Sequence, residues 1–152
     1  MPNRLPARSA LAPFIAVIAL FTAASALAAG YGHGRFAGTA KPAFGGGKGS
    51  PITIKVKGSR VRVVEMTFSF DCASDGSIQK RTVSTPFVRV QKGPAGGGAS
   101  FDGKVAAKGG DSVDVSVSFG LRQRSISGIA DGTMDVEGLP CMKDLSFKAN
   151  KR

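Results

Sequence analysis

The residue types that most often carry enzyme chemistry are sparse in this chain and are not arranged for it. His33 is the only histidine. It lies in a glycine-rich segment where no element would orient it, although a general base needs a fixed position as well as a suitable pKa. Serine is abundant, but no serine has a histidine partner nearby, which disfavours a Ser-His-Asp nucleophile. We therefore expect that the protein is not an enzyme.

The carboxylates form two groupings that could bind a cation or cleave a glycoside. Asp71 and Asp75 flank the first cysteine, but a calcium loop needs more closely spaced oxygens and a bidentate glutamate. The pair Asp75-Gly76 is instead typical of a turn. Asp131 and Asp135 share the outward side of one expected strand, whereas glycosidase carboxyls lie about 5–9 Å apart in a cleft. We expect no metal, no cofactor and no catalytic carboxylates.

Residues 1–28 have the layout of a secretory signal peptide. Two arginines and no acid precede an apolar stretch over 11–21, and Ala26-Leu27-Ala28 ends the segment as a cleavage site does. We expect cleavage after Ala28, with Ala26 and Ala29 as alternatives. An uncleaved membrane anchor is the other interpretation, because the uncharged run approaches the about 20 residues that a spanning helix needs. Export predicts a secreted or envelope-associated protein, and the Ala, Gly and Arg usage suggests a bacterial source.

The two cysteines, Cys72 and Cys141, are predicted to form a disulfide. Export would place them in an oxidising compartment, where two thiols usually pair. Closing so long a loop is worth roughly 4 kcal/mol in the chain-entropy description of the unfolded state.

The elements that must position these residues are β-strands. Residues 29–34 are expected to form a flexible lead and residues 35–150 a single domain, in which apolar and polar residues alternate and no stretch has helical period. Eight strands are expected, at about 35–41, 52–57, 60–72, 77–90, 99–107, 112–121, 126–136 and 141–149. Short connections predict an antiparallel meander, either a small up-and-down barrel or a two-sheet β-sandwich.

Local details sharpen this expectation. The apolar parity switches from odd at Val63 to even at Val64, which is typical of a β-bulge. Gly58-Ser59 predicts a type II′ hairpin turn, and Pro86 should break or bend the fourth strand. Two sets should point inward, namely the phenylalanines 36, 68, 70, 101, 119 and 147, and the glycines 38, 103, 128 and 132. We expect Phe44 to plug the core from a loop, with a lid or contact over a barrel mouth as the alternative. We expect no titratable side chain to point inward.

The basic residues predict a charged surface. The formal net charge is +11, and it falls to +9 without the two arginines of residues 1–28. Strands that alternate up and down would gather these cations at the end opposite the disulfide. This basic rim comprises Lys55, Lys57, Arg60 and Arg62 on one hairpin, Arg122 and Arg124 on another connection, and Arg35, Lys92, Lys148, Lys151 and Arg152.

Clustered cations attract polyanions. The absence of aromatic residues among them argues against specific nucleic-acid binding, which uses base stacking. A solvated face without any partner is the competing interpretation.

The start Gly34-Arg35-Phe36-Ala37-Gly38-Thr39 resembles the Gly-x-aromatic-x-Gly-Thr first strand of a group of small exported bacterial all-β domains. The first cysteine after an apolar strand, the Ser125–Gly128 segment and the second cysteine near the end are similar as well. The resemblance implies a fold and no known activity. It also implies a closing aromatic strand after the second cysteine, where Phe147 would take that place.

Together these observations predict an exported, non-enzymatic binding or structural domain. Its basic rim would dock an anionic envelope polymer or a lipid surface. The alternative is a small barrel that holds an apolar ligand in its interior, for which eight strands are just enough. We expect a monomer with no membrane span once the signal peptide is removed.

Overall fold

The computed structural model describes residues 33–94 and 96–152, and this part of the chain forms ten β-strands. The predicted signal peptide, 1–28, and most of the predicted lead lie outside the described residues. Within the described ranges, no helix has the length and apolar character needed to cross a bilayer. The strands are β1 (Gly34–Pro42), β2 (Ser50–Lys57), β3 (Arg60–Phe70), β4 (Gln79–Val83), β5 (Val88–Arg89), β6 (Gln91–Gly93), β7 (Gly96–Ala106), β8 (Ser112–Leu121), β9 (Ser125–Val136) and β10 (Leu139–Lys151).

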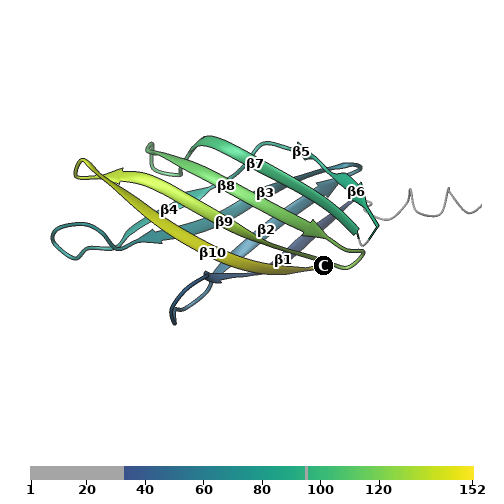
Figure 1. Ribbon diagram of the computed structural model, residues 1–152, viewed down its shortest axis with the longest axis horizontal. Coiled ribbons are helices and arrows are strands. Elements are labelled where there is room, and N and C mark those ends of the chain that lie inside the picture. The colour runs from purple at the N-terminus through teal and green to yellow at the C-terminus, as the bar shows by residue number, and fades with distance from the viewer. Residues whose placement is uncertain (1–32, 95) are drawn as a thin grey trace, which may run out of the picture.

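The strands form one antiparallel meander that curls until its first and last long strands meet (Figure 1). The order across the sheet is β4-β3-β2-β1-β10-β9-β8-β7-β6. β1 pairs with β10 from Phe36 opposite Lys151 to Pro42 opposite Leu145. The predicted all-β antiparallel meander is therefore confirmed.

The sheet is not closed by a continuous ladder, because the region around Pro86 interrupts the strand predicted over 77–90. Proline lacks the N–H that a ladder needs, and this region is divided into β4, β5 and β6. β5 pairs with β3 on one side of the gap, and β6 pairs with β7 on the other. A bridge between Val83 and Ala107 links the two sides at the other end of the gap. The eight expected strands thus become ten.

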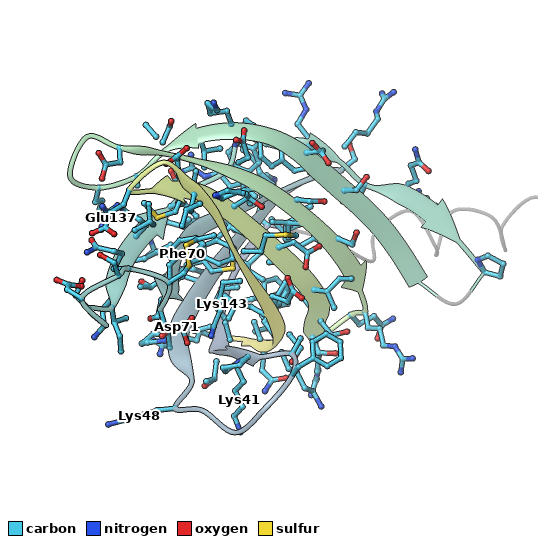
Figure 2. The ribbon with its side chains drawn as sticks, turned by 60° about the vertical axis from the view of Figure 1, so that its left-hand side comes forward. Lys41, Lys48, Phe70, Asp71, Glu137 and Lys143 are labelled. Atoms are coloured by element: carbon cyan, nitrogen blue, oxygen red, sulfur yellow. A yellow bond between two sulfur atoms is a disulfide. The ribbon has the colours of Figure 1, made fainter. Side chains whose placement is uncertain are left out.

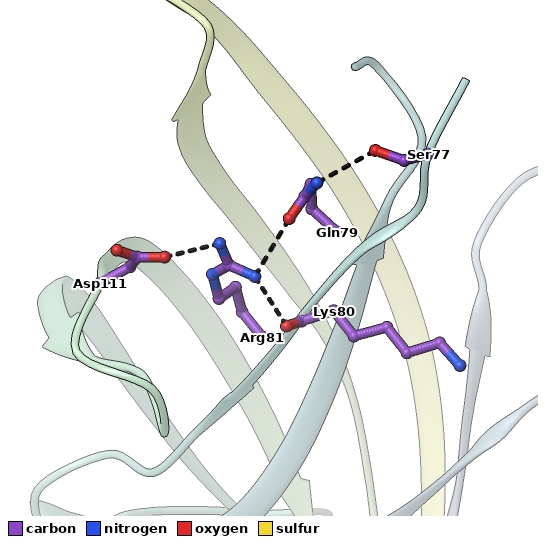
Figure 3. Close-up of polar contacts among 5 residues, drawn as sticks. All are labelled: Ser77, Gln79, Lys80, Arg81 and Asp111. Atoms are coloured by element: carbon purple, nitrogen blue, oxygen red, sulfur yellow. Dashed lines mark hydrogen bonds and ion pairs between the residues drawn. The ribbon is translucent and has the colours of Figure 1, made fainter. Parts of the chain in front are cut away.

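A chain of polar side chains spans this seam beside the bridge (Figure 3). Arg81 on β4 forms an ion pair of 2.6 Å with Asp111 in the connection between β7 and β8. Its guanidinium also donates to the carbonyl of Lys80 at 3.0 Å and to the side chain of Gln79, which itself donates to Ser77. Of these contacts, the Arg81–Asp111 ion pair crosses from β4 to the β7–β8 connection, where the amide of Lys108 also donates to the carbonyl of Thr82 at 2.9 Å.

The inward face of the curled sheet is a packed apolar core. The side chains of Phe68 and Phe70 are fully buried. A Cβ added at Gly132 would lie 2.8 Å from the ring of Phe68, and one added at Gly128 would lie 2.6 Å from the ring of Phe147. Glycine at these positions makes room for an aromatic ring from elsewhere in the sheet. The predicted alternation of small and large inward residues is therefore confirmed at these contacts.

The predicted bulge and first hairpin turn are also found. Thr53 pairs with Glu65 and Ile54 pairs with Val63, which leaves Val64 as the extra residue. Gly58 has a φ of 60°, as the first central residue of a type II′ turn requires. A second tight turn lies at Glu137 and Gly138, which both have positive φ, 55° and 83°. This is typical of a type I′ turn, so β10 begins at Leu139, two residues before the predicted start at 141.

The predicted disulfide between Cys72 and Cys141 is present, with the two Cα atoms 6.1 Å apart. β3 ends at Phe70, two residues before the predicted end. Cys72 consequently lies on the exposed connection that follows, and only Cys141 is buried with the inward residues. The disulfide ties the β3–β4 connection to the beginning of β10.

Candidate anion-binding site

The meander gathers cations at one end of the sheet. The β2–β3 hairpin, the β8–β9 connection, β6, the start of β1 and the end of β10 all lie at the end opposite the disulfide (Figure 1). These segments carry the eleven residues of the predicted basic rim. No acidic residue occurs in 34–64, 76–101, 115–130 or 145–152. The charge of the described residues is therefore polarised along the strands.

Register places five of these cations, together with Arg89, in a grid on the outer face of adjacent strands. Lys55 on β2 lies directly opposite Arg35 on β1 and Arg62 on β3. One step further along, Arg60 lies opposite both Lys57 and Arg89. Adjacent strands are about 4.8 Å apart, and successive outward positions on one strand are about 6.7 Å apart. We call Arg35, Lys55, Lys57, Arg60, Arg62 and Arg89 the cation grid.

No cation of the grid has a carboxylate partner within the described residues. The ion pairs there all lie at the seam or toward the disulfide end: Arg81–Asp111, Lys104–Asp114, Lys108–Glu65 and Lys143–Asp71. Like charges directly opposite each other destabilise a sheet. The grid is therefore an arrangement that the fold tolerates rather than one that stabilises it.

Arg62 is held more firmly than its neighbours. Its guanidinium carbon lies 4.9 Å from the centre of the Phe87 ring, a cation–π distance. Its Nε is buried and makes no hydrogen bond with any described group. Phe87 therefore serves as a support for a cation of the grid. The expectation that no aromatic residue lies among these cations was wrong.

The structure brings together four of the six residues predicted to bind anions, namely Lys55, Lys57, Arg60 and Arg62. Arg122 and Arg124 lie apart from them, on the connection between β8 and β9. They continue the rim through β10, because the amide of Lys151 donates to the carbonyl of Arg124 and the amide of Arg152 donates to that of Arg35, each at 3.0 Å.

The pattern missed Arg89 as a member of this surface. β5 is only two residues long, which is too short for an alternation to show. Its pairing with β3 opposite Arg60 is a tertiary feature that no local signal in the sequence reports.

A groove of about 980 Å³ adjoins the grid at the β6–β7 hairpin. Arg89, Lys92 and Arg122 line it together with a run of glycines on β7 and Gly120 on β8. A Cβ at Gly120 would meet only ordinary contacts, so the fold does not demand a glycine there. The groove extends the cationic surface toward Arg122.

The disulfide end holds a smaller pocket of about 220 Å³, lined in part by Lys143, Asp71 and Lys48 (Figure 2). The Nζ of Lys143 lies 3.8 Å from a carboxylate oxygen of Asp71, and the Lys143 side chain is 25% exposed. Lys143 shares the parity of Cys141 and Leu145, so the expectation that no titratable side chain points inward was wrong. The expectation that Phe44 plugs the core was also wrong, because this side chain is 84% exposed.

The carboxylates of Asp75 and Asp135 accept hydrogen bonds from backbone amides a few residues further along the chain. Asp75 accepts a hydrogen bond from the amide of Ser77 at 2.8 Å, and hydrogen bonds from Ser77 lower the pKa of Asp75. The predicted turn at Asp75-Gly76 is confirmed, with a φ of 72° at Gly76. Asp135 likewise accepts from the amide of Gly138 at 2.7 Å.

The sequence pattern did not predict one pair of neighbouring carboxylates. Asp131 on β9 lies directly opposite Asp144 on β10. Partial burial, and then the negative charge and hydrogen bond of Asp144, raise the pKa of Asp131. Among the described residues, no group of three His, Cys, Asp or Glu side chains could hold a metal ion.

Comparison of the chain with protein-family models, with curated proteins and with solved structures gives no match. The resemblance to small exported bacterial β-domains therefore stays a prediction, and function has to be argued from the surface itself.

Proposed function

We propose that this protein is an exported, non-enzymatic domain that binds an anionic polymer of the cell envelope through its basic rim and the cation grid that overlaps it. The observation that carries the proposal is the grid, in which cations face one another across strands without a carboxylate partner among the described residues. A polyanion would supply the missing countercharge. The signal-peptide layout of residues 1–28 and the disulfide are compatible with such a location.

A polymer is favoured over a lipid surface by the positions of the exposed apolar side chains. Binding at a bilayer interface combines electrostatic attraction with insertion of apolar residues. The large exposed apolar residues in the described part of the chain lie toward the disulfide end or midway along β9: Phe44, Ile78, Ile129, Leu139 and Met142. The basic rim thus has charge without residues that insert into a bilayer.

The packed core favours the surface over the interior as the place of binding. The inward positions of β2, β3, β8 and β9 are almost all fully buried, and aromatic rings fill the space beside the inward glycines at 128 and 132. An apolar ligand would have to displace these side chains. We therefore rank the alternative of an interior ligand below surface binding.

Binding of the purified exported protein, with its disulfide intact, to soluble polymers tests the proposal. Poly(glycerol phosphate) and polygalacturonate are the anionic probes, and dextran is the neutral control. The double variant Lys55→Gln, Lys57→Gln removes two charges from the grid. The double variant Lys41→Gln, Lys48→Gln removes the same charge near the disulfide end.

We expect at least one anionic probe to bind at low salt and the affinity to fall as salt rises. The grid variant should bind about tenfold more weakly, whereas the matched variant should differ by less than about twofold. Absence of binding to both anionic probes at low salt would overturn the proposal. Equal losses in the two variants would also overturn it, because binding would then follow net charge and not the grid.

A further inference from the structure

The two-dimensional order of the grid carries a more specific inference, which rests on the proposed function. We infer that the ligand is a phosphodiester-linked polyol polymer that lies across the strands on the cation grid. Arg35, Lys55 and Arg62 form one row across β1, β2 and β3, and Lys57, Arg60 and Arg89 form a second row across β2, β3 and β5. A chain that crosses the strands meets a cation on each of them, about every 4.8 Å.

The groups between the charges of such a polymer must be small and polar. Nucleobases and sugar rings are commonly bound by stacking on exposed aromatic side chains. The aromatic ring within the grid, Phe87, is half-buried and is covered by the guanidinium of Arg62. Recognition by this surface therefore depends on the anionic groups and not on the rings of a nucleic acid or a polysaccharide.

The arrangement of the cations in two rows favours phosphate over carboxylate. Four of the six grid residues are arginines, whose planar forks bind two oxygens of a phosphate or of a carboxylate with fixed geometry. The non-bridging oxygens of a phosphodiester are directed tetrahedrally, so they can accept hydrogen bonds from cations of both rows. The two oxygens of a carboxylate lie in one plane and are satisfied by a single fork. Arg62 is in addition held in place by Phe87, so less side-chain entropy is lost when it binds.

The test compares four probes on the exported protein at equal charge concentration. They are poly(glycerol phosphate), polygalacturonate, a single-stranded oligonucleotide, and vesicles that contain phosphatidylglycerol. We expect poly(glycerol phosphate) to bind about tenfold more tightly than polygalacturonate. If all six grid cations contact the polymer, the plot of log K against log salt should have a slope of about −4.

Conservative variants separate the role of the arginine forks from that of the charge. Arg60→Lys and Arg62→Lys keep the charge and lose the fork, so each should weaken poly(glycerol phosphate) binding by about threefold to fivefold. Arg81→Lys, at the seam and outside the basic rim, is the matched control and should leave this binding unchanged. A urea unfolding curve of each variant checks that the fold is retained.

The outcomes distinguish this inference from the proposed function. Equal affinity for the phosphate and carboxylate polymers would overturn the inference and leave the proposed function intact. Tighter binding to the oligonucleotide or to the vesicles would overturn the inference in favour of another class of ligand. Binding to none of the four probes would overturn both.

Discussion

If the fold keeps the grid cations close together although they repel one another, then removing one central charge should stabilise the folded protein. Lys55 is the appropriate residue, because it lies opposite two cations, Arg35 on one side and Arg62 on the other. Two unit charges about 6 Å apart in water repel each other by roughly 0.7 kcal/mol before screening by salt. Measured cross-strand pair effects in sheets fall in the range of about 0.2–1 kcal/mol. Two such repulsions predict that Lys55→Gln raises the free energy of unfolding by about 0.5–1 kcal/mol at low salt.

Urea unfolding followed by circular dichroism measures this change, because urea is uncharged and leaves the ionic strength free to vary. The stabilisation should be largest in about 20 mM salt and should nearly vanish in about 1 M salt, where the screening length is about 3 Å. Lys41→Gln is the control, since Lys41 lies opposite the uncharged Ser146, and its stability should stay unchanged. A Lys55→Gln variant that is less stable than the wild type, or a gain that does not depend on salt, would refute this reasoning.

Three further predictions concern the seam, the core and the carboxylate pair. Arg81→Gln should lower the free energy of unfolding by about 1 kcal/mol, because its ion pair with Asp111 is only partly exposed; an unchanged urea midpoint would show that the seam does not depend on it. Gly128→Ala should lower it by about 2–3 kcal/mol, because the added Cβ would collide with the backbone carbonyl oxygen of Ser118 and lie 2.6 Å from the ring of Phe147. A melting temperature equal to that of the wild type would contradict the tight packing. Asp131→Asn should stabilise the protein at pH 7, because partial burial and the charge of Asp144 raise the pKa of the folded carboxyl and its ionised form therefore opposes folding. This gain should shrink as the pH falls through the raised pKa toward the ordinary value of 3.8, and a gain that grew at pH 3 would have the wrong sign.

The long strands could be predicted because alternation of apolar and polar residues is a local property of the sequence. The parity switch at Val64 and the glycine at position 58 likewise predicted a bulge and a turn that the structure contains. The glycine at position 132 was predicted to face inward, and its reason appears only in the folded protein, where Phe68 of another strand occupies the space beside it.

The cationic surface could be predicted in part, and the residues that the prediction missed were missed for physical reasons. Alternation placed Lys55 and Arg62 outward, and the antiparallel meander then put them on neighbouring strands. Arg89 was missed because the strand that holds it is two residues long and follows a proline-containing segment. Lys143 was missed because a lysine was not expected at an inward position, although its side chain lies at the mouth of the sheet where Asp71 and solvent accommodate the charge. At inward positions near the end of the sheet, where solvent is within reach, a residue need not be apolar.

Backbone amide chemical shifts of the ¹⁵N-labelled protein, followed during titration with poly(glycerol phosphate) at low salt, test the central claim most directly. Binding on the basic rim and its grid should move the signals of residues 34–36, 55–62, 88–93 and 151–152, and added salt should reverse the change. Signals that move mainly around Cys72, Cys141 and Lys143, or none that move at all, would contradict the claim that the grid is the binding surface.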